Sequence, residues 1–126
     1  MAVKQCPTEH QEQCAVVEWL QWRNITFFAV PNSNNMSNAN RLQAMRMAVK
    51  LKKEGVRAGV SDLVIVGYDR ILFVEMKRLY GGKEREEQEK FRTEVIALNH
   101  QAIVCKGAEA AIKAIESWLI HNRMGE

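Results

Sequence analysis

The sequence has few cysteines, and their spacing argues against both disulfide bonds and a structural zinc site as stabilising features. Its 126 residues include three cysteines, Cys6, Cys14 and Cys105, with no Cys-x-x-Cys pair and no cluster of histidines beside them. An odd number without such spacing argues against a disulfide framework and against a structural zinc site. It favours a reducing, intracellular environment. Cys105 follows an apolar segment and is expected in the core.

Long hydrophobic runs are also lacking. No segment approaches the ~18 consecutive apolar residues of a membrane-spanning helix, and the first 14 residues, MAVKQCPTEHQEQC, contain no apolar core of a signal peptide. We therefore expect a cytoplasmic protein without a membrane partner. Aromatic residues make up 7% of the chain. They form no evident stacking platform of the kind that binds single-stranded nucleic acid.

What is present is typical of one globular domain. Apolar residues are 47% and charged residues 26% of the chain, which excludes wholesale disorder. We predict a single domain over residues 1–126, with a core from about residue 8 to residue 119. The formal net charge of +3 is too small to indicate a nucleic-acid partner by itself, so the distribution of charge matters more.

Hydrophobic periodicity predicts four helices and four strands in the order αβαββαβα. The predicted helices are 8–23, 40–54, 84–99 and 107–121, and the predicted strands are 25–30, 61–67, 70–77 and 101–105. A polar loop is expected over 31–40. A hairpin followed by helical crossovers indicates an α/β domain whose mixed β-sheet is flanked by helices.

Apolar stripes on these helices predict their buried faces. The first helix carries one stripe through Glu9, Gln13, Val16 and Leu20 and a second through Glu12, Ala15, Trp19 and Trp22, so we expect it to be broadly buried. The remaining stripes are Leu42, Met45 and Val49; Gln88, Phe91, Val95 and Leu98; and Ala111, Ile115 and Leu119. Polar residues at the ends of such stripes need partners, and one shared site would supply them. Alternatively, Glu9, Gln13 and Gln88 are ordinary first-turn residues that the helix dipole favours.

The predicted hairpin contains an unusual pair of carboxylates. Alternation in RILFVEMK places Glu75 and Lys77 on one strand face with apolar neighbours. If the turn is centred on Tyr68-Asp69, Asp62 faces Glu75, and the two Cβ atoms lie ~5 Å apart. Like charges opposed in this way are destabilising unless they share a cation. All-oxygen ligands of this kind suit Mg²⁺ or Mn²⁺.

A simpler interpretation of the hairpin stays open. Asp62 would then cap a strand, and Glu75 would form an exposed ion pair with Lys77. A one-residue change in the turn would also move the two carboxylates to opposite faces of the sheet.

The specific order of these motifs resembles a known nuclease family. Glu9-x-x-x-Gln13, Val30-Pro31-Asn32, KLKKEGVRAGVSDL (50–63), FVEMKR (73–78) and Gln88 together resemble the VRR-NUC (virus-type replication-repair nuclease) domains of the PD-(D/E)xK superfamily. The chain is similar to the small stand-alone members from phages and prophages. The resemblance implies a restriction-endonuclease-like core with a mixed sheet. Two positions depart from it: Ser61 replaces the usual proline, and Glu84-Arg85 replaces the Leu-Ser that often opens the Gln88 helix.

The resemblance also implies a role for each matching residue. Asp62 and Glu75 would hold a divalent ion, with help from the carbonyl of Met76 and from Glu9. Lys77 would orient or polarise the attacking water, and Gln88 matches the glutamine of the following helix. Gly59 would allow close backbone approach before Asp62. The implied cofactor is Mg²⁺ or Mn²⁺, with no other small-molecule cofactor.

One basic segment is the candidate contact to DNA. Residues 41–57 contain six basic residues and one acidic residue, Glu54, a net charge of +5. The basic residues are Arg41, Arg46, Lys50, Lys52, Lys53 and Arg57, and Asn32 would add a neutral contact. Such a segment binds phosphates with an affinity that falls as salt rises. The alternative interpretation is that these charges only form a solvated helix face.

These features predict a metal-dependent DNA endonuclease. The resemblance implies cleavage of branched DNA such as four-way (Holliday) junctions by a homodimer, because cutting two strands calls for two active sites. The alternatives are a non-catalytic DNA-binding module that kept the fold, and a duplex nuclease of lower structure selectivity. We find no insert for sequence-specific recognition of the restriction-enzyme type.

Overall fold

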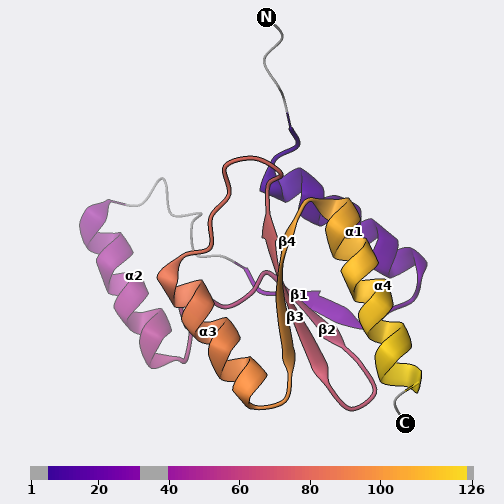
Figure 1. Ribbon diagram of the computed structural model, residues 1–126. Helices are drawn as coiled ribbons and strands as arrows, with labels where there is room; N and C mark the ends of the chain where they lie inside the picture. The colour runs from indigo at the N-terminus through magenta and orange to yellow at the C-terminus, as the bar shows by residue number, and fades with distance from the viewer. Residues whose placement is uncertain (1–5, 32–39, 125–126) are drawn as a thin grey trace, which may run out of the picture.

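The elements follow the predicted order (Figure 1). The computed structural model describes residues 6–31 and 40–124, with side chains described up to residue 121. The elements are α1 (Glu9–Trp22), β1 (Phe27–Ala29), α2 (Arg41–Lys53), β2 (Leu63–Val66), β3 (Ile71–Lys77), α3 (Glu86–Ala97), β4 (Gln101–Lys106) and α4 (Ala108–Met124). Within these ranges, no helix is long and apolar enough to cross a membrane. Most of the predicted loop over 31–40, including Asn32, lies outside the described residues.

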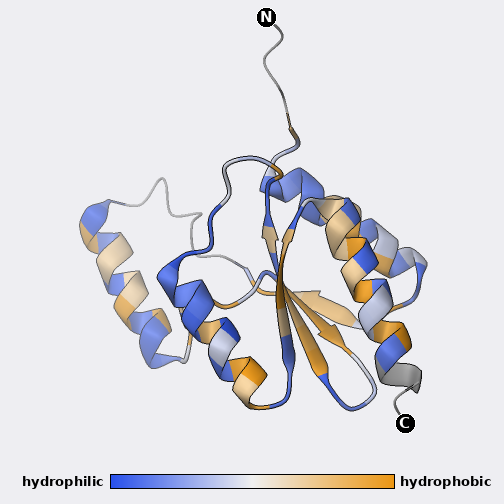
Figure 2. Cartoon of the chain, in the orientation of Figure 1, coloured by the Kyte–Doolittle hydropathy of each residue, from blue (hydrophilic) through white to orange (hydrophobic). Residues whose placement is uncertain are grey.

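The strands form one mixed sheet in the order β1-β2-β3-β4. The β1–β2 and β2–β3 pairs are antiparallel, and β3 pairs with β4 in parallel. Val64 pairs with Phe73 in the β2–β3 hairpin, which confirms the predicted register. Hydrophobic residues dominate the strands, and the helices mix apolar and polar residues (Figure 2). The α/β class and the mixed sheet are therefore as predicted.

Helices cover both faces of the sheet. Even-numbered residues of β3, such as Leu72 and Val74, are buried with Val16 and Leu20 of α1 and Ile115 of α4. Odd-numbered residues face the other way, toward α3. There the rings of Phe73 and Phe91 meet edge to face with centroids 5.1 Å apart. Because strand side chains alternate, this arrangement places Glu75 and Lys77 on the α3 face.

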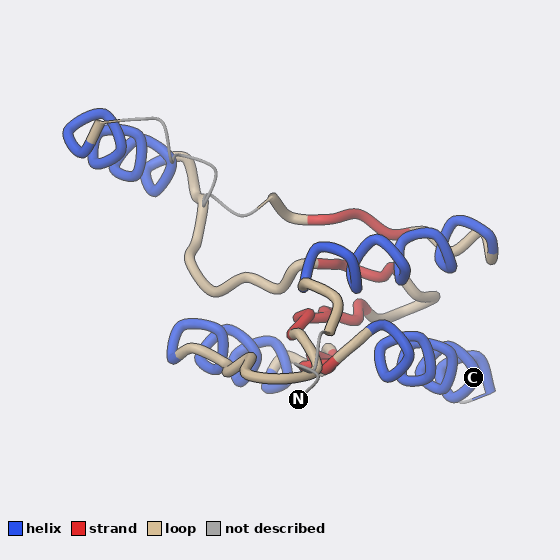
Figure 3. Tube along the Cα trace, turned by 90° about the horizontal axis from the view of Figure 1, so that it is seen from above, coloured by secondary structure: helices blue, strands red, loops and turns tan. Residues whose placement is uncertain are grey.

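Helix α2 stands apart from these layers (Figures 1 and 3). Its N-cap is Asn40, whose Oδ1 accepts a hydrogen bond of 2.8 Å from the backbone N–H of Gln43. No described residue of α2 is buried. The predicted stripe of Leu42, Met45 and Val49 is 57, 58 and 56% exposed. The helix is therefore present as predicted, but its apolar face has no partner within the described part of the chain.

Two predicted faces are wrong in detail. α1 is buried along one stripe, Glu12, Val16 and Leu20, and not broadly, since Trp22 at its last turn is 77% exposed. Leu98, expected on the inward face of the third helix, follows the end of α3 and is exposed. Both side chains lie at the C-terminal end of their helix, where no described residue buries them.

Candidate active site

Asp62 and Glu75 meet beneath α3, as the hairpin register predicts. Asp62 directly precedes β2, and Glu75 lies in the central part of β3. Both are nearly inaccessible to solvent, at 6% and 5% exposure. Oδ2 of Asp62 accepts a hydrogen bond of 2.8 Å from the backbone N–H of Met76. A side-chain hydrogen bond also joins the two carboxyl groups. The exposed ion pair considered as the alternative is therefore excluded.

This environment raises the pKa of Glu75 from its ordinary value of 4.5 to about 9. Burial is the largest cause, because it penalises the charged form. The hydrogen bond from the protonated Glu75 to Asp62 and the negative charge of Asp62 raise the pKa further. Lys77 opposes the shift, and Glu9 adds to it. Without a bound cation, Glu75 is therefore protonated at neutral pH.

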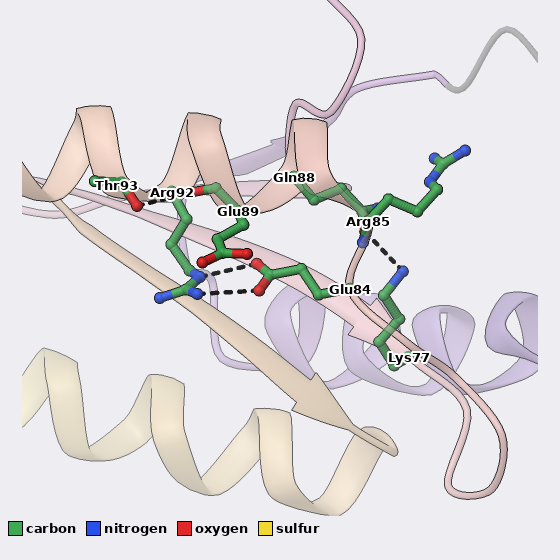
Figure 4. Close-up of polar contacts among 7 residues, drawn as sticks. All are labelled: Lys77, Glu84, Arg85, Gln88, Glu89, Arg92 and Thr93. Carbon is green, nitrogen blue, oxygen red and sulfur yellow. Dashed lines mark hydrogen bonds and ion pairs between the residues drawn. The ribbon is translucent and has the colours of Figure 1, made fainter.

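Lys77 is buried at the end of the same strand and is held by α3. Its Nζ donates a hydrogen bond of 3.0 Å to Oε1 of Gln88, and both residues are 6% exposed. The same Oε1 accepts a bond of 2.8 Å from the backbone N–H of Arg85. Figure 4 shows Lys77 reaching up from its strand to the first turn of α3. Gln88 therefore fixes the ammonium group relative to the helix.

The hydrogen bond between Gln88 and the Arg85 N–H caps the start of α3, where Glu84-Arg85 replaces the Leu-Ser dipeptide. Arg85 occupies the N-cap position, and its side chain makes no capping hydrogen bond. Gln88 instead satisfies the Arg85 N–H from within the helix, as the N3 residue of a capping box does. The unusual Glu84-Arg85 dipeptide thus leaves the helix start intact and does not displace Gln88.

Gly59 brings the segment before Asp62 against the start of α3. A Cβ atom at this position would lie 2.4 Å from the carbonyl carbon and oxygen of Glu87 and 2.8 Å from the nitrogen of Gln88. Gly59 also has a φ of +85°, which L side chains rarely adopt. Only glycine permits this approach, so Gly59 couples the Asp62 segment to the helix that carries Gln88. Ser61, which departs from the motif of the resemblance, is also buried.

The burial of Glu9 and Glu12 in α1 differs from what the predicted stripes indicate. Glu9 is exposed in the first turn, although its charge contributes to the raised pKa of Glu75. Glu12 is buried, and its Oε2 has no hydrogen-bond partner in the described structure. Sequence reasoning placed Glu12 off the Val16–Leu20 face. Its spacing of four residues from Val16 is compatible with that face, but so is the spacing of three residues between Gln13 and Val16, so spacing alone does not identify the buried residue.

The donor set fits a hard divalent cation. In residues 6–31 and 40–124, no group of three or more Asp, Glu, His or Cys side chains is arranged to hold a metal ion. The site instead offers two adjacent carboxylates. Mg²⁺ is commonly held by one or two carboxylates, with water and substrate phosphate as its other ligands. Asp62 and Glu75 match that pattern, and the predicted roles of Glu9 and of the Met76 carbonyl as further ligands stay predictions. The Met76 side chain lies in the core on the opposite face.

The basic residues of α2 lie outside this site. Arg41, Arg46, Lys50, Lys52 and Lys53 are all exposed on the helix that stands apart. Arg57, in the loop after α2, differs from these five, since its guanidinium pairs with Glu94 and its Cζ lies 5.3 Å from the ring centroid of Phe91. Arg57 is thus held against α3, and the other five are free to contact a ligand.

Comparisons with known proteins agree with this geometry. No family model matches the sequence, and no curated protein matches it. A solved structure described as a VRR_NUC domain protein matches with a TM-score of 0.71 and 22% sequence identity. The match covers 89% of this chain and 88% of that chain. The chain therefore has the fold of a VRR_NUC domain protein, as the resemblance in its motifs predicts.

Proposed function

We propose that this protein is a metal-dependent DNA endonuclease whose active site comprises Asp62, Glu75, Lys77 and Gln88. One observation carries the proposal: two buried carboxylates adjoin one another on a single sheet face, and a buried lysine follows two residues after Glu75. Ionising both carboxyl groups is costly without a bound cation, because like charges in a buried site repel one another. The fold shared with a VRR_NUC domain protein supports the same conclusion.

The residues divide the chemistry of phosphodiester hydrolysis between them. Asp62 and Glu75 would hold Mg²⁺ or Mn²⁺, and the bound ion would supply neutralisation of charge on the scissile phosphate and a better water nucleophile. Glu75 must lose its proton for this role, so its raised pKa links metal binding to proton release. Lys77, fixed by Gln88, orients the attacking water and stabilises negative charge that develops on the phosphate.

Helix α2 supplies the proposed contact to the DNA backbone. Its exposed basic residues, Arg41, Arg46, Lys50, Lys52 and Lys53, are available to bind phosphates. Asn32 is proposed to add a neutral contact, and Arg57 to contact DNA at the base of α2. Because α2 projects from the body of the protein, it extends the binding surface beyond the small area around Glu75 (Figure 3).

We further propose that the protein acts as a homodimer on branched DNA, such as a four-way junction. Paired incisions need two active sites, which a twofold-symmetric dimer provides. The exposed stripe of Leu42, Met45 and Val49 is the surface that we expect a second copy to cover. A monomer gains nothing from such a stripe, whereas two copies of one helix bury it mutually.

A cleavage assay tests the proposal. Labelled four-way junctions and linear duplexes of matching sequence are incubated with wild-type protein and Mg²⁺, Mn²⁺ or EDTA. We expect cleavage with either metal, a preference for the junction, and none with EDTA. Glu75→Ala and Lys77→Ala should each abolish cleavage, and Lys113→Ala, which removes an exposed charge on α4, should leave it unchanged.

Each other outcome is informative. Binding of DNA without cleavage under all metal conditions would mean a non-catalytic DNA-binding module. Equal cleavage of junction and duplex would mean a duplex nuclease of lower selectivity. Full cleavage by Glu75→Ala would place the chemistry elsewhere. Sedimentation of the wild type as a monomer would remove the proposed dimer without affecting the proposed reaction.

A further inference from the structure

An open hollow of about 670 Å³ adjoins the buried lysine of the active site. It lies between β4, the loop after β3, and α3, on the sheet face that carries Glu75. Lys77 forms part of its wall, and its floor is the apolar strand β4. Four cationic side chains line it, Lys77, Lys83, Arg92 and Lys106, against one carboxylate, Glu84. We call this feature the β4 hollow.

The one carboxylate is already neutralised. Arg92 donates to both oxygens of Glu84, over 2.9 Å from Nε and 3.0 Å from Nη2. Figure 4 shows this pair beneath α3, with Lys77 on the same side of the helix. Among the described residues, Lys83 and Lys106 form no ion pair. The hollow therefore keeps an excess of positive charge beside the catalytic lysine.

The sheet register places two of these cations next to one another. Lys106 of β4 pairs with Lys77 of the parallel strand β3, so their side chains leave the sheet on the same face. Like charges on directly paired strand residues are destabilising. The Nζ of Lys77 turns toward Gln88, while Lys106 is exposed at the rim of the hollow. An anion between them would relieve this repulsion.

We propose that the β4 hollow binds a phosphate of the cleaved DNA strand that neighbours the scissile phosphate, with Lys83 and Lys106 as its ligands. This inference rests on the proposed nuclease function. Lys77 is common to the hollow and the active site, so a strand whose scissile phosphate lies at Lys77 can pass directly into the hollow. The floor of small and apolar β4 residues leaves room for the sugars of the DNA backbone, and the cations at the rim are available for its phosphate.

This surface is separate from the basic helix α2. Lys83, Arg92 and Lys106 come from three different segments, and each is unremarkable in the sequence. Two phosphate-binding surfaces would therefore flank the active site. The β4 hollow would hold the strand being cut, and α2 would contact DNA farther away.

The test measures binding separately from cleavage. Fluorescently labelled DNA is titrated with wild type and with the double variant Lys83→Ala/Lys106→Ala, in Ca²⁺ to support binding without turnover. The matched control is Arg23→Ala/Lys113→Ala, which removes two charges from the opposite side of the sheet. We expect the test variant to bind roughly tenfold or more weakly, and to lower the slope of log K against log salt by about 1, as loss of one phosphate contact does.

Neutral methylphosphonate linkages, placed one at a time around the cut site, identify the phosphate. At one position next to the cut, the neutral linkage should weaken DNA binding by wild type. The same linkage should not further weaken binding by the test variant, which already lacks the contact to that phosphate. If the test variant binds like wild type, or if no position couples to it, the β4 hollow is not a phosphate site even though wild type still cuts DNA. If wild type neither binds nor cuts DNA, the proposed function fails and this inference fails with it.

Discussion

Replacing Glu75 by glutamine should stabilise the metal-free protein, and the gain should grow with pH. The pKa of Glu75 is raised from 4.5 to about 9 in the folded state, chiefly by burial and by Asp62. Between these two values the folded state binds a proton that the unfolded state has released. Raising the pH therefore favours unfolding throughout this window. Glutamine keeps the shape and the hydrogen-bond donor of the protonated acid but does not titrate.

The size of the effect follows from the shift. Each unit of pKa difference corresponds to about 1.4 kcal/mol. Between pH 4.5 and pH 7.5 the wild type should therefore lose about 4 kcal/mol of unfolding free energy relative to Glu75→Gln. In a domain of this size, that difference corresponds to a Tm gap of about 10 °C or more. At pH 5 the gap should shrink to about 3 °C or less.

Thermal unfolding in EDTA across pH 5–8 measures this gap. Glu18→Gln, which neutralises an exposed glutamate of α1, serves as the matched control and should follow the wild-type curve. Adding Mg²⁺ at pH 7.5 should raise the Tm of wild type and not that of Glu75→Gln. A cation at ten times its dissociation constant contributes about 1.4 kcal/mol.

Two results would refute this reasoning. Parallel curves for wild type and Glu75→Gln from pH 5 to pH 8 would mean that Glu75 is not held in its protonated form. Destabilisation by Glu75→Gln at pH 7.5 would mean that the ionised carboxylate already has a favourable partner in the metal-free protein.

Three further predictions concern positions around the site and on α2. Gly59→Ala should lower the free energy of unfolding in urea by about 3 kcal/mol, because of backbone strain and contact with Glu87. Gly55→Ala, at a φ of +98° with open space around it, should lower it by about 1 kcal/mol. Equal losses would contradict the close approach at Gly59. Gln88→Leu should lower the free energy of unfolding by about 3 kcal/mol, because Lys77 and the Arg85 N–H lose their acceptor. A variant that keeps full stability and cleavage would show that Gln88 is not part of the site. Met45→Glu should leave unfolding unchanged within about 0.5 kcal/mol and yield monomers in sedimentation, whereas a persistent dimer would place the interface away from α2.

The hairpin illustrates what local sequence can predict. Only two residues, Tyr68 and Asp69, link the strand pattern of residues 61–67 to that of 70–77, so alternation and turn length together fix which residues oppose one another. The contact between Asp62 and Glu75 follows from that register. Both lie near a turn in the sequence, and no distant segment is needed to place them.

Features that depend on distant segments were not predictable in the same way. No turn sets the register of parallel strands, so nothing in the sequence indicates that Lys106 pairs with Lys77. The stripe on α2 predicts an apolar face but not what covers it. Glu12 and Gln13 lie at similar angles to Val16, and only packing against the sheet decides that Glu12 is the buried residue.

The most direct test of the central claim measures single-turnover cleavage and metal binding on the same three proteins. In Mg²⁺, wild type should cut a labelled four-way junction, while Glu75→Gln and Lys77→Ala should be slower by at least about a hundredfold, as when charge-stabilising groups are removed. Titration calorimetry should show that Lys77→Ala still binds the metal and that Glu75→Gln does not. Wild-type protein that leaves every DNA form intact in Mg²⁺ and Mn²⁺, or Glu75→Gln that cuts at the wild-type rate, would contradict the account.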